Sequence, residues 1–191
     1  MFHVIQLVMQ DTKERIIDLA ARLIKTRGFN AFSYKDIADP LEIKNAAIHY
    51  YFPSKADLGI AVVEQEMEKM ALNKLKWATL PEDKQLQLLF ERFSRKSLQG
   101  FICLMGSLSP DFETLPAPMQ ERVKQMSEGI LQWTALCLEN GRKRQLFHFE
   151  GDAYNRALLV ISDLLASLLL SRVMGKEVFE KMRKQLLIDL L

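Results

Sequence analysis

The chain has few of the residues that form disulfide frameworks or metal sites. It contains 191 residues, of which 2 are cysteines and 3 are histidines. Because Cys103 and Cys137 are too few for a disulfide framework, we expect a reducing, cytoplasmic environment. None of His3, His49 and His148 is spaced with another histidine or cysteine in the way that metal ligands are. The sequence therefore predicts no bound metal and no other cofactor.

Motifs for catalysis are also lacking. The sequence holds no glycine-rich phosphate loop, no nucleophile elbow and no HExxH pair. Its 26 basic and 24 acidic residues show no arrangement suited to acid–base chemistry, and they leave a formal net charge of +2. We therefore expect a protein that is not an enzyme. A net charge this small favours no class of partner, so nucleic-acid binding would have to come from a local arrangement of residues.

A secretion signal and a long hydrophobic run are missing as well. Residues 1–10 are apolar but lack a basic leader and a small-residue cleavage site. The longest apolar stretch, residues 157–170, has 14 residues and includes Ser162 and Asp163, whereas a helix that spans a bilayer needs about 20. We expect no membrane partner. Either Met1 or Met9 can be the start, because the first eight residues fall outside every motif.

Helical periodicity is what the sequence has instead, over nearly its whole length. Apolar residues make up 49% of the chain, and their spacing matches one face of a helix rather than the alternation of a strand. We predict an all-α fold of about nine helices, the first of which Asp11 would cap. The approximate ranges are 11–27, 33–40, 44–51, 54–77, 81–100, 101–105, 118–140, 152–174 and 176–191.

Two short helices, 33–40 and 44–51, follow a longer one and lie about four residues apart. This is the spacing of a helix-turn-helix, whose second helix enters the major groove of DNA. Small side chains at Ala46 and Ala47 would let that helix approach the bases, and Lys44, Asn45 and Tyr50 can hydrogen-bond bases or phosphates. From the spacing alone, a plain helical hairpin remains the alternative.

Particular residues carry a family resemblance. The segments RIIDLA (15–20), RGF (27–29), SYKDIA (33–38) and IHYYFPSKADL (48–58) resemble the TetR family of bacterial transcriptional regulators. The resemblance implies an N-terminal helix-turn-helix domain, residues 9–55, and a helical ligand-binding and dimerisation domain, residues 56–191. It also implies a regulator, most often a repressor, that binds a palindromic operator on double-stranded DNA as a homodimer and is released by a small effector.

The predicted turn departs from the family pattern of a glycine, an aliphatic residue and then serine or threonine. Glu42, Ile43 and Lys44 stand there, after Pro40. We expect Pro40 to end or kink the first short helix, because proline lacks an N–H and disfavours helix at Asp39. Lys44 cannot accept a hydrogen bond and so cannot cap the second short helix.

The resemblance also assigns roles to residues at the DNA interface. Ser33 would cap the first short helix and lie near a phosphate. The groove would be faced by Lys44, Asn45, Ala46, Ala47 and Tyr50, with His49, Tyr51 and Lys55 at its edge. Core packing is the alternative for Tyr51, and a solvated helix start is the alternative for Lys55.

Beyond residue 56, methionine and aromatic side chains are dense. They suit an adaptable apolar pocket between helices, and the side chains expected to line it are Phe90, Phe101, Met105, Met126 and Trp133. Because few charged residues fall among them, we expect an apolar or aromatic effector. The alternative is that these residues are only core, in a helical adaptor that acts through a protein partner without an inducing small molecule.

The helix predicted over 152–174 is apolar almost all round, so it must be buried on two sides. In the resembling family the last two helices pair with their mates at a two-fold axis. On that basis we predict a homodimer whose interface contains Leu164, Leu168, Phe179, Met182 and Leu186.

Overall fold

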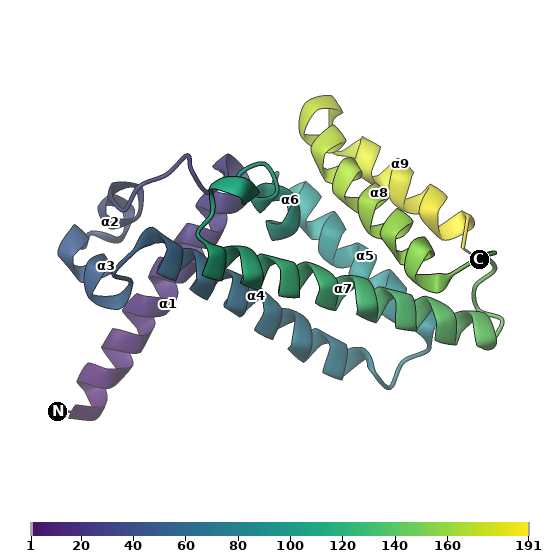
Figure 1. Ribbon diagram of the computed structural model, residues 1–191, viewed down its shortest axis with the longest axis horizontal. Helices are drawn as coiled ribbons and strands as arrows, with labels where there is room; N and C mark the ends of the chain where they lie inside the picture. The colour runs from purple at the N-terminus through teal and green to yellow at the C-terminus, as the bar shows by residue number, and fades with distance from the viewer. Residues whose placement is uncertain (1, 191) are drawn as a thin grey trace.

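A computed structural model describes the backbone of residues 2–190 and the side chains of residues 11–190. Within these residues the chain forms nine α-helices and one short 3-10 helix, with no strand, so the all-α prediction is confirmed (Figure 1). Met1, one of the two possible starts, lies outside the described residues. The elements are α1 (Phe2–Arg27), α2 (Lys35–Leu41), α3 (Asn45–Tyr51), α4 (Lys55–Trp77), α5 (Glu82–Leu98), α6 (Leu104–Leu108), η1 (Phe112–Thr114), α7 (Ala117–Lys143), α8 (Ala153–Met174) and α9 (Glu177–Ile188).

Several predicted helix boundaries are wrong, three of them outside the predicted helix-turn-helix. Asp11 lies inside α1 rather than at its start, since no glycine or proline interrupts residues 2–27. The helix predicted over 101–105 begins only at Leu104, where the Cys103 sulfur accepts a hydrogen bond from the Gly106 N–H. Gly141 does not end α7 but lies inside it, where its missing side chain makes room for the Phe147 ring, which would lie 2.3 Å from a Cβ atom.

Two long helices, α4 and α7, link the two ends of the molecule. Figure 1 shows α1, α2 and α3 at one end of an elongated bundle and α8 and α9 toward the other. The first turn of α4 has a capping box, in which Ser54 and Asp57 exchange hydrogen bonds. Leu58 near its start packs in the core of the first end, and Trp77 at its end packs in the core of the second.

The core at the N-terminal end is not built by the first three helices alone. It contains Ile16, Ile37 and Ile48 from those helices, but also Leu108 of α6 and Met119 of α7. At Gly59 of α4 a Cβ atom would lie 2.6 Å from the Met119 side chain, so the two helices approach closely there. The first three helices are therefore packed directly against the rest of the bundle, in a core that α4, α6 and α7 share.

The helix α8 is the most apolar element. By length and composition alone, its 22 residues could cross a membrane. Seven of its side chains, however, are buried inside the subunit: Ala157, Val160, Ile161, Leu164, Ser167, Leu168 and Ser171. Burial of this kind is what a core helix of a bundle shows.

Candidate DNA interface and ligand cavity

The predicted helix-turn-helix is formed by α2, a tight turn and α3. Pro40 does not end α2, which continues to Leu41. Glu42 then adopts the left-handed conformation, with φ of 55°. The Ile43 N–H bonds to the Ala38 carbonyl at 3.1 Å, and the Glu42 N–H bonds to the Asp39 carbonyl at 3.2 Å. These two bonds form a Schellman-type C-cap. The turn therefore forms without the glycine that is usual in the family, and Glu42 adopts a left-handed conformation that is strained for a residue with a side chain.

The helix α3 presents a polar, exposed surface. Ile48 is fully buried and holds α3 against α2, whereas Tyr50 is 70% exposed. Lys44, Asn45, Ala46 and His49 are exposed as well, and Ala47 and Tyr51 are half-buried. As predicted, Lys44 occupies the N-cap of α3 without a side-chain hydrogen bond. The exposed residues carry the donors and acceptors that base edges and phosphates require.

Ser33 does not cap α2 as predicted. Its N–H and its hydroxyl both donate to the Asp36 carboxylate at 2.8 Å, and the helix begins one residue later, with Tyr34 at the N-cap. Both bonds lower the pKa of Asp36, and the bond from the Ser33 N–H has the larger effect. Ser33 remains exposed, so its place at the DNA surface stays a prediction.

Lys55 was expected at the groove edge, and the structure turns it inward instead. Its ammonium donates to the Phe32 carbonyl and lies 4.2 Å and 4.8 Å from the centres of the Phe32 and Phe29 rings. Burial lowers its pKa. The charge contacts a carbonyl and two aromatic faces within the protein. Lys55 therefore joins the start of α4 to the loop before α2, and its ammonium does not point outward to a phosphate.

The other two edge residues are held differently from each other. The exposed His49 ring packs edge-on against Tyr34, with 4.7 Å between ring centres, and its Nδ1 lies 3.4 Å from the Pro53 carbonyl. Tyr51 packs partly against the N-terminal core and edge-on against Tyr50, at 5.2 Å between centres. Both side chains are thereby oriented by their neighbours, which suits a rigid interface.

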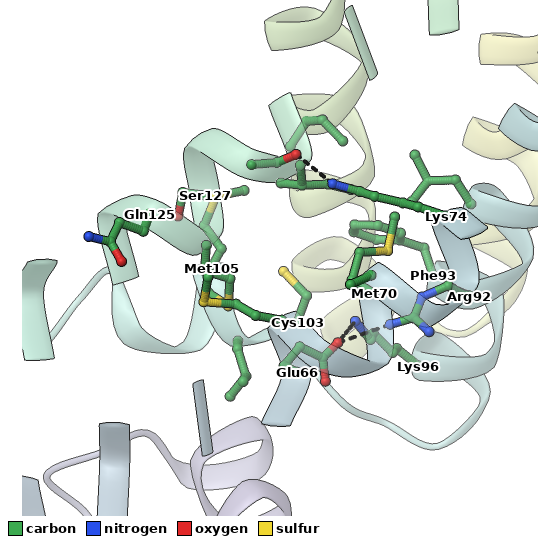
Figure 2. Close-up of a pocket in the computed structure, with 18 residues that line it drawn as sticks. Glu66, Met70, Lys74, Arg92, Phe93, Lys96, Cys103, Met105, Gln125 and Ser127 are labelled. Atoms are coloured by element: carbon green, nitrogen blue, oxygen red, sulfur yellow. Dashed lines mark hydrogen bonds and ion pairs between the residues drawn. The ribbon is translucent and has the colours of Figure 1, made fainter. Parts of the chain in front are cut away.

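A cavity of about 260 Å³ lies between α4, α5, α6 and α7 (Figure 2). Met105 and Met126 line it, as predicted from the sequence, but Phe90, Phe101 and Trp133 are not among its lining residues. Phe90 is fully buried in the core, and Trp133 packs against Trp77 with 5.7 Å between ring centres. The apolar part of the lining consists mainly of Met67, Met70, Leu89, Phe93, Leu104, Met105, Met126, Ile130 and Ile161.

Charged residues also line this cavity, contrary to the expectation of an apolar wall. Glu66 of α4 accepts from Arg92 at 3.2 Å and from Lys96 at 3.1 Å, both on α5, and pairs with Lys25 of α1 at 3.1 Å. We call these four residues the Glu66 cluster. Their side chains are only 15–17% exposed. The sequence could show that Arg92 and Lys96 share a face of one helix, but only the fold brings Glu66 and Lys25 to them.

The electrostatic environment of the Glu66 cluster favours the charged form of Glu66. Burial alone would raise the pKa of Glu66, but the charges of Lys96, Lys25 and Arg92 outweigh it and hold that pKa well below its usual range. Burial lowers the pKa of Lys25, an effect that Glu66 partly offsets. On another part of the cavity wall, Lys74 donates to the Gly129 carbonyl at 2.7 Å, and burial lowers its pKa.

The two cysteines are both buried, and Cys103 lines the cavity. Burial raises the pKa of both thiols, that of Cys137 to about 12. Since the thiolate is the reactive form, neither environment activates its cysteine. Both therefore serve as small, buried side chains.

The predicted dimer-interface residues need correction. Leu164, Leu168, Phe179 and Leu186 are each at most 7% exposed within one subunit, because these side chains fill the core between α5, α7, α8 and α9. Met182 is half-buried. The exposed apolar side chains on the last two helices are different ones: Tyr154, Leu158, Leu159, Leu169, Leu170, Val173, Met174 and Ile188. With the exposed Ser162 and Ala166 between them, those on α8 form what we call the α8 outer face.

Comparison with known proteins gives consistent matches to transcriptional regulators. A family profile described as bacterial regulatory proteins of the tetR family matches residues 16–62. The crystal structure of a TetR transcriptional regulator from Legionella pneumophila is 34% identical, covering 94% of this chain and 97% of that one with a TM-score of 0.84. The HTH-type transcriptional repressor NemR of Escherichia coli strain K12 is 22% identical over 169 residues, 85% of each chain.

A third similar protein was crystallised with a ligand. This protein, from Saccharomonospora viridis in complex with choline, is 22% identical and has a TM-score of 0.69, covering 93% of this chain and 94% of that one. At this level of identity, the structural similarity shows that the two proteins share a fold and nothing further.

Proposed function

The chain belongs to the TetR family of bacterial regulatory proteins, and from this premise we propose that it is a ligand-responsive repressor that binds a palindromic operator as a homodimer. Residues 9–55 would bind DNA, and residues 56–191 would bind the effector and dimerise. The observation that carries the proposal is the surface of α3, where a buried Ile48 anchors a helix whose Asn45 and Tyr50 are exposed. A protein of this kind works in the cytoplasm, beside the DNA.

Dimerisation would place two α3 helices on one face of the DNA. In helix-turn-helix dimers the half-sites lie about 34–36 Å apart, one turn of the double helix. The α8 outer face supports a dimer, because a contiguous apolar surface on a soluble protein usually marks an interaction site. Ser162 and Ala166, in the middle of that face, would let two α8 helices approach closely.

The cavity would bind a small effector that is largely apolar or aromatic, in keeping with its methionine-rich walls. A ligand can change DNA affinity only if it binds the DNA-competent and released conformations differently. The helix α4 supplies the connection: Leu58 in its first turn is buried in the same core as Phe52 at the end of α3, and its middle lines the cavity through Glu66 and Met70. A coupling of about 1–3 kcal/mol would lower DNA affinity roughly 5–150-fold.

A mobility-shift assay with the DNA upstream of the gene tests this function. We expect a discrete complex that unlabelled copies of the same fragment compete away and that an unrelated fragment of equal length does not. Equal competition by both fragments, or no complex at all, would contradict the proposal. The second result would favour the helical adaptor that acts through a protein partner.

A further inference from the structure

We infer that the ligand of the cavity is a small amphiphilic carboxylic acid, whose carboxylate binds Arg92 and Lys96 and whose apolar part lies among the methionine side chains. This inference rests on the proposed function, since it names the chemical class of the effector. It also replaces the purely apolar effector that the sequence suggested.

The excess of positive charge around the cavity is the first argument. The lining residues include three cations, Lys74, Arg92 and Lys96, but Glu66 as the single carboxylate, and Lys25 adds a further cation behind Glu66. The Glu66 cluster therefore has three positive charges and one negative charge on side chains that are 15–17% exposed. Buried charges are costly unless they are paired, so a second anion would be stabilised there.

The geometry of the cationic groups is the second argument. Arg92 and Lys96 are one turn apart on α5 and both donate to the same Glu66 oxygen, Oε1. The Glu66 bond uses one of the five N–H donors of the guanidinium, which can also hold a carboxylate with two parallel bonds. Figure 2 shows Arg92, Lys96 and Glu66 gathered at one side of the cavity, with Met70 between them and Lys74.

The rest of the wall sets the size and nature of the other end of the ligand. It is formed largely by methionine, leucine, isoleucine and phenylalanine side chains. The volume of about 260 Å³ is just below the range of roughly 300–1,000 Å³ that is usual for ligand pockets. A short aliphatic or aromatic acid fits this combination, whereas a quaternary ammonium such as choline would be repelled by the cations.

The same contacts suggest how binding would be transmitted. A ligand carboxylate at Arg92 and Lys96 would compete with Glu66 for its two partners on α5. Glu66 is also paired with Lys25 near the end of α1. Weaker bonds from Glu66 to α5 would therefore weaken the link between α1, in the DNA-binding domain, and the helices that line the cavity.

Isothermal titration calorimetry on the full chain tests the ligand class directly. The probes are straight-chain carboxylates from hexanoate to dodecanoate, the alcohols of equal chain length, and choline. We expect at least one acid to bind about tenfold or more tightly than its alcohol, as loss of hydrogen bonds to charged groups implies, and choline not to bind. Equal affinity of acids and alcohols, or no binding of any acid, would overturn the inference.

Variants with opposite expected effects locate the carboxylate. Lys96→Met and Arg92→Met should each weaken acid binding about tenfold while leaving the alcohol unaffected. Glu66→Gln should tighten acid binding, because it removes the competing carboxylate, and a misfolded variant could not produce that result. Lys143→Met, at an exposed lysine on α7, is the matched control and should change nothing. Unchanged acid binding in both cation variants would refute the site.

The inference and the proposed function fail in different ways. If an acid binds through Arg92 and Lys96 but leaves the operator complex intact, the ligand class stands and the regulatory role falls. If the operator is bound specifically but no acid binds, the DNA-binding function stands and the ligand class is wrong.

Discussion

Lys25 and Glu66 form an ion pair of 3.1 Å that joins α1 to α4. Lys25 lies in the last turn of the first DNA-binding-domain helix, and Glu66 is in the middle of the helix that lines the cavity. Through Glu66 the pair continues to Arg92 and Lys96 on α5. One carboxylate thus holds three helices together at the junction between the two proposed functions.

The Glu66 cluster predicts a specific pH dependence of stability. The folded state lowers the pKa of Glu66, so its stabilising contribution is complete above its unfolded value of 4.5 and is lost as the pH falls toward the folded pKa. Glu66→Gln should therefore cost about 3 kcal/mol near pH 7, and its difference from wild type should shrink below pH 4.5. Urea unfolding across this range measures both. Glu64→Gln, at an exposed pair with Arg122, should cost less than about 1 kcal/mol at every pH. If the difference in free energy of unfolding between the wild type and Glu66→Gln does not change with pH, the ion pairs of Glu66 are not what stabilises the fold here.

The left-handed Glu42 predicts a stabilising substitution in the turn. A non-glycine residue in this conformation costs about 1–2 kcal/mol. Glycine removes that strain, but part of the gain in stability is lost because glycine gives the unfolded chain more conformational freedom. We expect Glu42→Gly to raise the free energy of unfolding by roughly 0.5–1 kcal/mol, while Glu42→Ala, which keeps the strain, leaves it nearly unchanged. Equal stability of the two variants in chemical denaturation would argue against a strained turn.

Two lysines near α3 should differ in their effect on DNA binding. Lys44 is exposed beside α3, so Lys44→Met should lower the slope of log affinity against log salt by about 0.9. Lys55→Met should leave the slope unchanged and lower stability, since the Lys55 ammonium is bound to the Phe32 carbonyl. Salt titrations of operator binding, paired with thermal unfolding, separate these outcomes. A reduced slope for Lys55→Met would mean that its side chain turns outward on DNA.

Adjacent leucines on α8 provide a matched test of the dimer surface. Leu168 is 1% exposed within one subunit and Leu169 is 51% exposed. A glutamate at Leu169 on the α8 outer face should give a folded monomer, because it puts a charge into the interface. A glutamate at Leu168 should unfold the subunit, because it buries an unpaired charge. Sedimentation and circular dichroism distinguish the two, and a dimeric Leu169→Glu variant would place the interface elsewhere.

The sequence predicts those parts of the structure that depend on local pattern. The helices and their order follow from apolar periodicity, and the capping box at Ser54 and Asp57 follows from residue type and spacing. The exposed face of α3 follows from the family resemblance and from the polar residues around Ile48. Pro40 misled because a Schellman turn with Glu42 in the left-handed region lets α2 run one residue past the proline.

Tertiary relationships are what the sequence could not predict. Phe90 and Trp133 are aromatic and lie in the correct domain, but only packing decides that they face the core and Met105 faces the cavity. Because α8 is apolar on all sides, the sequence indicated burial on two sides. It could not show that Leu168 faces its own subunit whereas Leu169 faces outward. The Glu66 cluster joins residues from three helices, separated by up to 71 positions between Lys25 and Lys96, and no local pattern marks it.

The most direct test of the account is operator affinity with α3 altered at its most exposed aromatic residue. Fluorescence anisotropy should compare the wild type, Tyr50→Ala, and a control at Leu75, which is exposed to a similar extent on α4 (73% against 70%). We predict that Tyr50→Ala weakens specific binding by about 1–3 kcal/mol, roughly 5–150-fold, while binding to unrelated DNA stays nearly the same. Leu75→Ala should bind like the wild type. Wild-type affinity of Tyr50→Ala for the operator would contradict the claim that α3 reads the DNA.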